Sequence, residues 1–79
     1  MVIFALGETL LRRGDLEEAQ TQLEAAARLE PGVARVYSSL GELYLKRGLK
    51  SEAARALRKS LAIEPKQDEV RRLLAEAGR

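Results

Sequence analysis

The chain contains no cysteine and no histidine among its 79 residues. Without cysteine it forms neither a disulfide nor a thiolate metal site, and without histidine it lacks the commonest metal ligand and the commonest general base. No glycine-rich phosphate loop or metal-spaced cluster occurs, and the polar pair Ser38 and Ser39 has no histidine to activate it. We therefore expect a protein that is not an enzyme, with no catalytic residues, no cofactor and no bound metal.

Aromatic residues and an excess of one charge are also scarce. Phe4, Tyr37 and Tyr44 are the three aromatic residues, and 14 basic residues are interleaved with 12 acidic ones, so the net charge is only +2. A surface that binds nucleic acid usually gathers its basic residues on one face and adds aromatic rings that stack on bases. Nucleic acid is therefore not the partner that this composition favours.

Long hydrophobic runs are absent as well. The longest apolar run extends from Met1 to Leu6, far short of the roughly 20 residues that a membrane span needs. A signal peptide would begin with basic residues and continue with a longer apolar stretch, and neither feature is present. The sequence thus predicts a cytoplasmic protein without a membrane span.

What the chain does contain is an internal repeat. Six pairs of residues recur 34 positions apart, namely Leu6/Leu40, Gly7/Gly41, Gly14/Gly48, Ala19/Ala53, Leu23/Leu57 and Pro31/Pro65. A fixed period of this length is typical of helical repeat proteins. Because one such unit is too small to bury its own apolar face, the copies are expected to stack on each other.

The spacing of apolar residues predicts five helices. They cover residues 2–13, 16–29, 34–47, 50–63 and 68–77. Gly14 and Gly48 are expected to end the first and third helices in the left-handed conformation. Pro31 and Pro65 are expected to close the second and fourth, since proline disfavours helical geometry in the residue before it.

Three helix starts have predicted caps. Asp15 and Glu18 read as a variant of the capping box, in which each side chain binds a free amide of the first turn. Leu49 stands where Asp15 stands in the first copy, so Ser51 is predicted to take over the cap and shift the fourth helix by one or two residues. Asp68 is predicted to cap the fifth helix.

The repeated residues resemble the tetratricopeptide repeat. The second copy carries the pattern as Tyr37, Leu40, Gly41, Tyr44, Gly48, Ala53, Leu57, Ser60 and Pro65. The first copy carries it as Ile3, Leu6, Gly7, Leu10, Gly14, Ala19, Leu23, Ala26 and Pro31, so the match spans residues 2–65. The two central glycines, Gly7 and Gly41, would let the helices of a hairpin approach closely, and the motif positions are interpreted as packing residues.

This resemblance implies an all-α, right-handed solenoid of helical hairpins with about five antiparallel helices. We expect one domain over residues 1–79, with a first repeat at 1–33 and a second at 34–67. The segment 68–79 would be a truncated third repeat or a capping helix.

In this family, partners usually bind the concave face formed by the first helix of each hairpin. By position, the candidate partner-binding residues are Phe4, Glu8, Leu11, Arg12, Arg35, Ser38, Ser39, Glu42, Leu45, Lys46 and Arg72. The tail helix would add Glu69, Leu73 and Glu76. We call this set the concave face, and Phe4 and Leu11 are expected to form an apolar strip on it, turned away from the stripe of Ile3, Leu6 and Leu10.

The resemblance therefore favours a protein–protein interaction scaffold that binds a peptide or a partner helix, with Arg35 and Arg72 as anchors. Glu8 and Glu42 would repel a ligand carboxylate, so these arginines are expected either to pair within the protein or to meet a ligand of mixed charge. The alternative is a homo-oligomeric assembly unit, in which a second copy covers the apolar N-terminal edge at Met1, Phe4 and Leu11. A separate possibility is that an upstream repeat covers this edge. A lesser alternative is an RNA-binding helical repeat.

Overall fold

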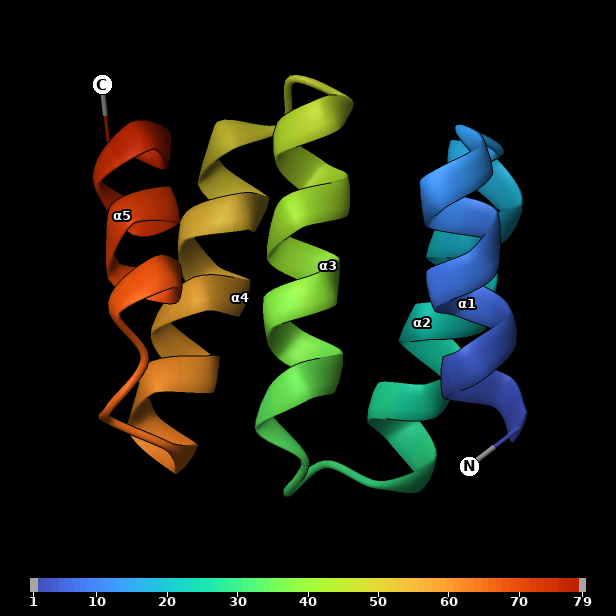
Figure 1. Ribbon diagram of the computed structural model, residues 1–79, viewed down its shortest axis with the longest axis horizontal. Helices are drawn as coiled ribbons and strands as arrows, with labels where there is room; N and C mark the ends of the chain where they lie inside the picture. Colours follow the sequence, from blue (N-terminus) through green and yellow to red (C-terminus); the bar gives the residue numbers. More distant parts are fainter. Residues whose placement is uncertain (1, 79) are drawn as a thin grey trace.

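Five helices make up the computed structural model shown in Figure 1, which describes residues 2–78. They are α1 (Val2–Arg13), α2 (Leu16–Leu29), α3 (Ala34–Lys46), α4 (Lys50–Ile63) and α5 (Asp68–Ala77). The predicted helices are confirmed, with α3 ending one residue earlier than expected. Met1 and Arg79, the outermost residues of the predicted domain, lie outside the described residues.

The helices form two antiparallel hairpins and a closing helix. In the first hairpin α1 packs against α2, in the second α3 packs against α4, and α5 lies against α4. The hairpins meet through α2 and α3, while α3 also contacts α1 and α5. Figure 1 shows this order from the α1–α2 end to α5 at the opposite end. The predicted all-α stack of helical hairpins is confirmed.

Two glycines end the first helix of each hairpin, as predicted. Gly14 and Gly48 have φ angles of +86° and +76°, in the left-handed region that glycine adopts without a steric penalty. The backbone then turns back on the helix: the amide of Asp15 donates to the carbonyl of Leu10, and the amide of Leu49 donates to that of Tyr44. The carbonyls at both helix ends thereby gain partners.

Asp15 is the N-cap residue of α2 as predicted, but none of the three predicted side-chain caps forms. The Asp15 side chain makes no capping hydrogen bond; its carboxylate lies 3.4 Å from Nε of Arg13. Helix α4 begins at Lys50 after Leu49, so Ser51 lies within the helix, and Asp68 is the first residue of α5 rather than its cap. In both hairpin turns, the amide of the residue after the glycine donates to a carbonyl in the last turn of the preceding helix. This backbone hydrogen bond fixes where the second helix begins, and no side-chain cap is needed.

The core consists of two clusters of buried side chains. The first cluster lies mainly between α1, α2 and α3 and contains Leu10, Leu11, Ala19, Leu23, Ala26, Val36, Leu40, Leu43 and Ala56. The second lies between α4 and α5 and contains Ala53, Ala54, Leu57, Val70 and Ala77. Tyr44 packs against both clusters and so connects them.

Close helix approach at the central glycines is confirmed. A Cβ atom on Gly7 would lie 2.7 Å from Cδ2 of Leu23, and one on Gly41 would overlap the Leu57 side chain in the same way. Since neither leucine side chain has any exposed surface, it has little room to move aside. Glycine therefore permits the tight packing of both hairpins.

The orientation of α1 differs from the prediction. Leu11 is only 6% exposed and belongs to the first cluster, whereas Leu6 is 45% exposed and Val2 83% exposed. The corresponding α3 residues, Val36 and Leu40, are 0% and 5% exposed, because the first hairpin packs against that face. Within residues 2–78 no element plays this part for α1, so its equivalent face remains open.

Candidate protein-binding groove

One side of α3 faces a hollow surface. With 3.6 residues per turn, residues 35, 42 and 46 fall on one side of the helix and residues 37, 40 and 44 on the other. The first side carries most of the predicted concave face. Side chains of α5 line both hollows on this side of α3, and a side chain of α1 lines one of them. The first helices of the two hairpins and the closing helix together form the surface.

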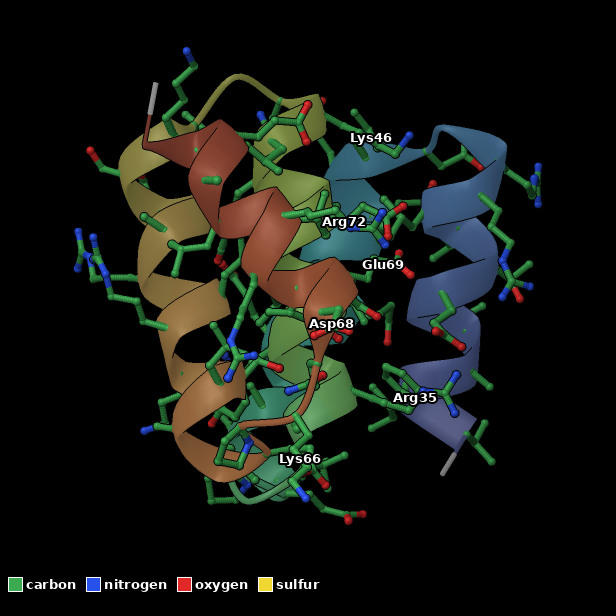
Figure 2. The ribbon with its side chains drawn as sticks, turned by 60° about the vertical axis from the view of Figure 1, so that its left-hand side comes forward. Arg35, Lys46, Lys66, Asp68, Glu69 and Arg72 are labelled. Carbon is green, nitrogen blue, oxygen red and sulfur yellow. The ribbon has the colours of Figure 1, made fainter. Side chains whose placement is uncertain are left out.

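Two cavities lie along this surface. The one between α3 and α5 measures about 450 Å³ and is lined by Glu42, Leu45, Lys46, Glu69, Leu73 and Glu76. The other measures about 330 Å³ and is lined by Glu8, Arg35, Ser38, Ser39, Glu42, Gln67, Glu69, Val70 and Leu73. Because Glu42, Glu69 and Leu73 line both, we treat the two cavities as one feature and call it the groove. Figure 2 shows Arg35 near α1, Lys46 near the end of α3, and Glu69 on α5.

An internal ion pair occupies the α1 side of the groove. Nη2 of Arg35 lies 3.4 Å from Oε2 of Glu8, and the Arg35 guanidinium carbon lies 5.3 Å from the centre of the Phe4 ring. The ring and the carboxylate both favour a cation at this place. Of the two possibilities left open for Arg35, the structure shows pairing within the protein.

The α5 side of the groove is predominantly acidic. Glu42, Glu69 and Glu76 line it together with one cation, Lys46. Among residues 2–78, none of these three carboxylates takes part in an ion pair or a hydrogen bond. In the same part of the chain, no group of acidic side chains is placed to hold a metal ion. The groove is thus neutralised at one end and negatively charged at the other.

Most residues of the predicted concave face line the groove. These are Glu8, Arg35, Ser38, Ser39, Glu42, Leu45 and Lys46, together with Glu69, Leu73 and Glu76 of the tail helix. Ser39 is nevertheless only 8% exposed.

The remaining predicted residues lie elsewhere. Leu11 is buried in the first cluster, and Phe4 is half-buried beneath Arg35. Arg12 and Arg72 are exposed but line neither cavity. The expected apolar strip of Phe4 and Leu11 is therefore absent from the groove, and Leu45 and Leu73 supply its apolar surface instead.

Sequence reasoning missed two lining residues, Gln67 and Val70. Gln67 stands just before α5, where its amide nitrogen donates to the carbonyl oxygens of Ser60 and Glu64 at 3.1 and 2.6 Å. Val70 belongs to the predicted apolar stripe of the tail helix and is 5% exposed at the base of the groove. A single glutamine between two helices gives no indication in the sequence of which groups its side chain will contact, so its position in the groove is seen only in the structure.

The opposite side of α3 carries a third cavity, of about 420 Å³. It is lined by Tyr37, Leu40, Tyr44, Glu52, Arg55, Ala56 and Lys59. The Tyr44 hydroxyl donates a 2.8 Å hydrogen bond to Oε2 of Glu24 on α2. Burial raises the pKa of Tyr44, and the bond to the Glu24 carboxylate raises it further. This bond joins the two hairpins.

Comparison with known proteins agrees with this architecture. The family model described as "Tetratricopeptide repeat" matches residues 4–69, which is most of the chain. No curated protein matches it. The repeat boundaries near residues 33 and 67 stay predictions. None of the described helices has both the length and the apolar character needed to cross a membrane, and the cytoplasmic location stays a prediction.

Proposed function

The chain belongs to the tetratricopeptide repeat family, and on that basis we propose that it binds a peptide or a helix of a partner protein in the groove. Repeats of this family generally mediate protein–protein interactions and generally act as non-catalytic scaffolds. The observation that supports the groove as the binding site is its continuity: residues of α1, α3 and α5 line two adjoining cavities of about 330 and 450 Å³.

The composition of the groove suits a peptide ligand. Leu45 and Leu73 are half-buried and present apolar surface, while Ser38 and the glutamates offer polar groups beside it. A groove with apolar anchors and a polar rim is a common way to hold an amphipathic helix or an extended segment. Binding would depend on shape and surface chemistry, with no bond made or broken.

Selection from a random peptide display library tests this proposal. We expect the selected peptides to shift the backbone amide NMR signals of α3 and α5 around the groove. They should bind Leu45→Glu about tenfold more weakly, because a charge replaces an apolar anchor. Leu29→Glu is the matched control, since Leu29 is 65% exposed at the end of α2 and lies outside the groove. Selected peptides that shift signals elsewhere and bind Leu45→Glu normally would place the binding surface on another face.

Self-association is a second candidate function, supported by the open face of α1. Val2 and Leu6 are exposed there, although the matching face of α3 is buried by a neighbouring hairpin. A second copy could cover this face through a symmetric contact. Light scattering on a size-exclusion column, over a tenfold concentration range, should then give a mass above 8.8 kDa, and Leu6→Glu should return it to the monomer value. A monomer mass at every concentration would exclude this candidate.

A further inference from the structure

Equivalent positions in the two halves of the groove carry different charges. Glu8 and Glu42 lie 34 residues apart, one repeat period, on α1 and α3. Arg35 and Glu69 are separated by the same period, on α3 and α5. The Glu8–Arg35 pair between α1 and α3 therefore corresponds to Glu42 and Glu69 between α3 and α5. A glutamate stands where the first half of the groove has its arginine.

The Glu8–Arg35 pair shows which charges meet between neighbouring first helices in the groove. There the carboxylate of one helix meets a guanidinium from the next helix, which also lies over the Phe4 ring. In the second half, Glu42 and Glu69 line the same two cavities, and neither has an ion-pair partner within residues 2–78. Two carboxylates that share a groove repel each other, and a cation placed between them relieves that repulsion.

Among residues 2–78, the surrounding cations form no ion pair with these carboxylates. Glu76 adds a third carboxylate to the larger cavity, where Lys46 is the one basic lining residue. Arg72 is exposed on α5, lines neither cavity and forms no ion pair among the described residues. The α3–α5 half of the groove thus offers three carboxylates and one ammonium group to a ligand.

Apolar surface adjoins these carboxylates. Leu45 and Leu73 line the same cavity as Glu42 and Glu69, and both leucines are half-buried. A ligand that used the whole cavity would therefore place an apolar side chain against the leucines and a basic side chain against the glutamates.

We infer that the partner segment is basic and amphipathic, with an arginine or lysine placed between Glu42 and Glu69 and an apolar side chain placed against Leu45 and Leu73. This inference rests on the proposed function, since it specifies the class of peptide that the groove binds. The partner supplies in the second half of the groove the cation that Arg35 supplies in the first. Charge complementarity of this kind sets the choice of partner and accelerates association.

Two synthetic probe peptides of about 14 residues test the inference by fluorescence anisotropy. They share one amphipathic pattern of leucines, and their polar positions are all lysine in one peptide and all glutamate in the other. We expect the lysine peptide to bind at least about tenfold more tightly, with an affinity that falls as salt is added because the charges are exposed.

The decisive variant is Glu69→Arg, which recreates the charge pattern of the first half of the groove. Its new guanidinium should pair with Glu42 and weaken binding of the lysine peptide by about tenfold or more. Glu69→Gln, which removes the charge alone, should weaken it by about threefold. Glu17→Arg makes the same charge change on the exposed surface of α2, outside the groove, and should leave binding unchanged. Circular dichroism of each variant checks that the helices are retained.

The remaining outcomes separate this inference from the proposed function. If the glutamate peptide binds as tightly as the lysine peptide, or if Glu69→Arg leaves lysine-peptide binding unchanged, the inference is overturned. The proposed function then still stands if display-selected peptides lose affinity for Leu45→Glu. If neither probe binds, the inference is likewise overturned, and if selection also yields no groove-binding peptide, the proposed function is overturned with it.

Discussion

Gly41 determines how closely α3 and α4 approach each other. A Cβ atom at this position would overlap the fully buried Leu57 side chain. In a helix interior, alanine is more favourable than glycine by about 1 kcal/mol. Crowding a packed core costs about 1–3 kcal/mol, so the substitution should be destabilising on balance.

We therefore expect Gly41→Ala to lower the free energy of unfolding by about 1 kcal/mol in urea titrations, the crowding cost less the gain in helix propensity. Gly32→Ala is the control, because no atom outside its chain neighbours lies within 4 Å of a Cβ built there, and it should be close to neutral. Equal stability of Gly41→Ala and the unchanged protein would show that the crowding costs no more than the roughly 1 kcal/mol that alanine gains in a helix interior.

Tyr44 should make the stability of the protein sensitive to alkaline pH. Its pKa is raised in the folded state, chiefly by burial and then by the Glu24 carboxylate. Between the unfolded value near 10 and the folded pKa, the unfolded chain has lost a proton that the folded chain retains. The unfolded state binds fewer protons in that range, so the free energy of unfolding falls as the pH rises above about 10.

Tyr44→Phe should remove this contribution while keeping the aromatic ring. At neutral pH the free energy of unfolding of the variant should be about 1–2 kcal/mol lower, because Glu24 loses the hydrogen bond from Tyr44 and, among the described residues, keeps the one from Gln20. From about pH 8 to about pH 11, urea titrations should show a smaller decline for the variant than for the unchanged protein. Lysine ionisation affects both proteins alike and cancels in the comparison. Parallel declines would contradict the role assigned to the hydroxyl.

At the scale of single residues, the sequence predicted packing partners better than exposure. Glycine repeated at one position of each hairpin was sufficient to predict a close approach, since glycine inside a helix is costly and usually has a packing reason. The assignment of Leu6 and Leu11 failed because periodicity defines stripes on a helix without saying which neighbour covers each one. Leu40, which stands one repeat period after Leu6, is buried in the core. Leu6 is exposed because no described hairpin packs against its side of α1.

At the scale of elements, Gln67 attaches α5 to the end of α4. Its side-chain amide donates to the carbonyl oxygens of Ser60 and Glu64 and to the Ser60 hydroxyl oxygen. Ser60, which is fully buried, in turn donates to the carbonyl oxygen of Ala34 at the start of α3. One side chain thus orders the link between the closing helix and the second hairpin.

We expect Gln67→Ala to loosen α5 before the rest of the molecule. The free energy of opening α5 should fall by about 1–2 kcal/mol, since the carbonyls of Ser60 and Glu64 would then accept hydrogen bonds from water. Hydrogen exchange should accelerate at the α5 amides and change little in α1 and α2. Lys66→Ala, one residue earlier on an exposed side chain, should leave exchange unchanged. Equal acceleration in all five helices would show that α5 does not open separately.

The helix ends show what local sequence can and cannot predict. Gly14 and Gly48 marked the ends of α1 and α3 correctly because positive φ angles are costly for other residues. The side-chain caps predicted at Asp15 and Asp68 are absent, because the turn leaves Asp15 without a capping hydrogen bond and α5 begins at Asp68 itself, after Gln67. Asp15 instead pairs with Arg13, and Asp68 lies 3.8 Å from Arg71. Such choices depend on the path of the turn and leave no pattern in the sequence.

At the scale of the whole molecule, the core is divided into two clusters that share Tyr44 as a neighbour. Leu23 is fully buried in the first and Leu57 in the second. In stacked repeats, each unit draws its stability from itself and its immediate neighbours. Damage to one cluster should therefore affect the two ends of the molecule unequally.

Leu57→Ala and Leu23→Ala test this division. Each should lower the free energy of unfolding by about 2–5 kcal/mol, because a buried leucine is removed and a cavity remains. By hydrogen exchange, Leu57→Ala should lower protection more in α4 and α5, and Leu23→Ala more in α1 and α2. Uniform loss along the chain in both variants would mean that the two clusters unfold as one unit.

The repeat period was enough to predict the order and pairing of the helices, since equal spacing implies equal packing. It could not predict which charged side chains of the groove form ion pairs. Glu8 and Glu42 occupy the same position in each period, yet one is paired with Arg35 and the other has no such partner in the described chain. That difference depends on which side chain the following helix brings across, and it becomes visible only when α3 and α5 are placed in space.

Helix α5 packs on α4 much as α3 packs on α2. Further hairpins could therefore be added to the stack in the same way. Val36 and Val70 are buried at positions one period apart, and each helix presents the same face to the hairpin before it. A duplicate of residues 34–67 inserted after residue 67 would therefore dock on α4 through its own valine and receive α5 on its far side. Such an elongated protein should fold with one more hairpin and a higher melting temperature.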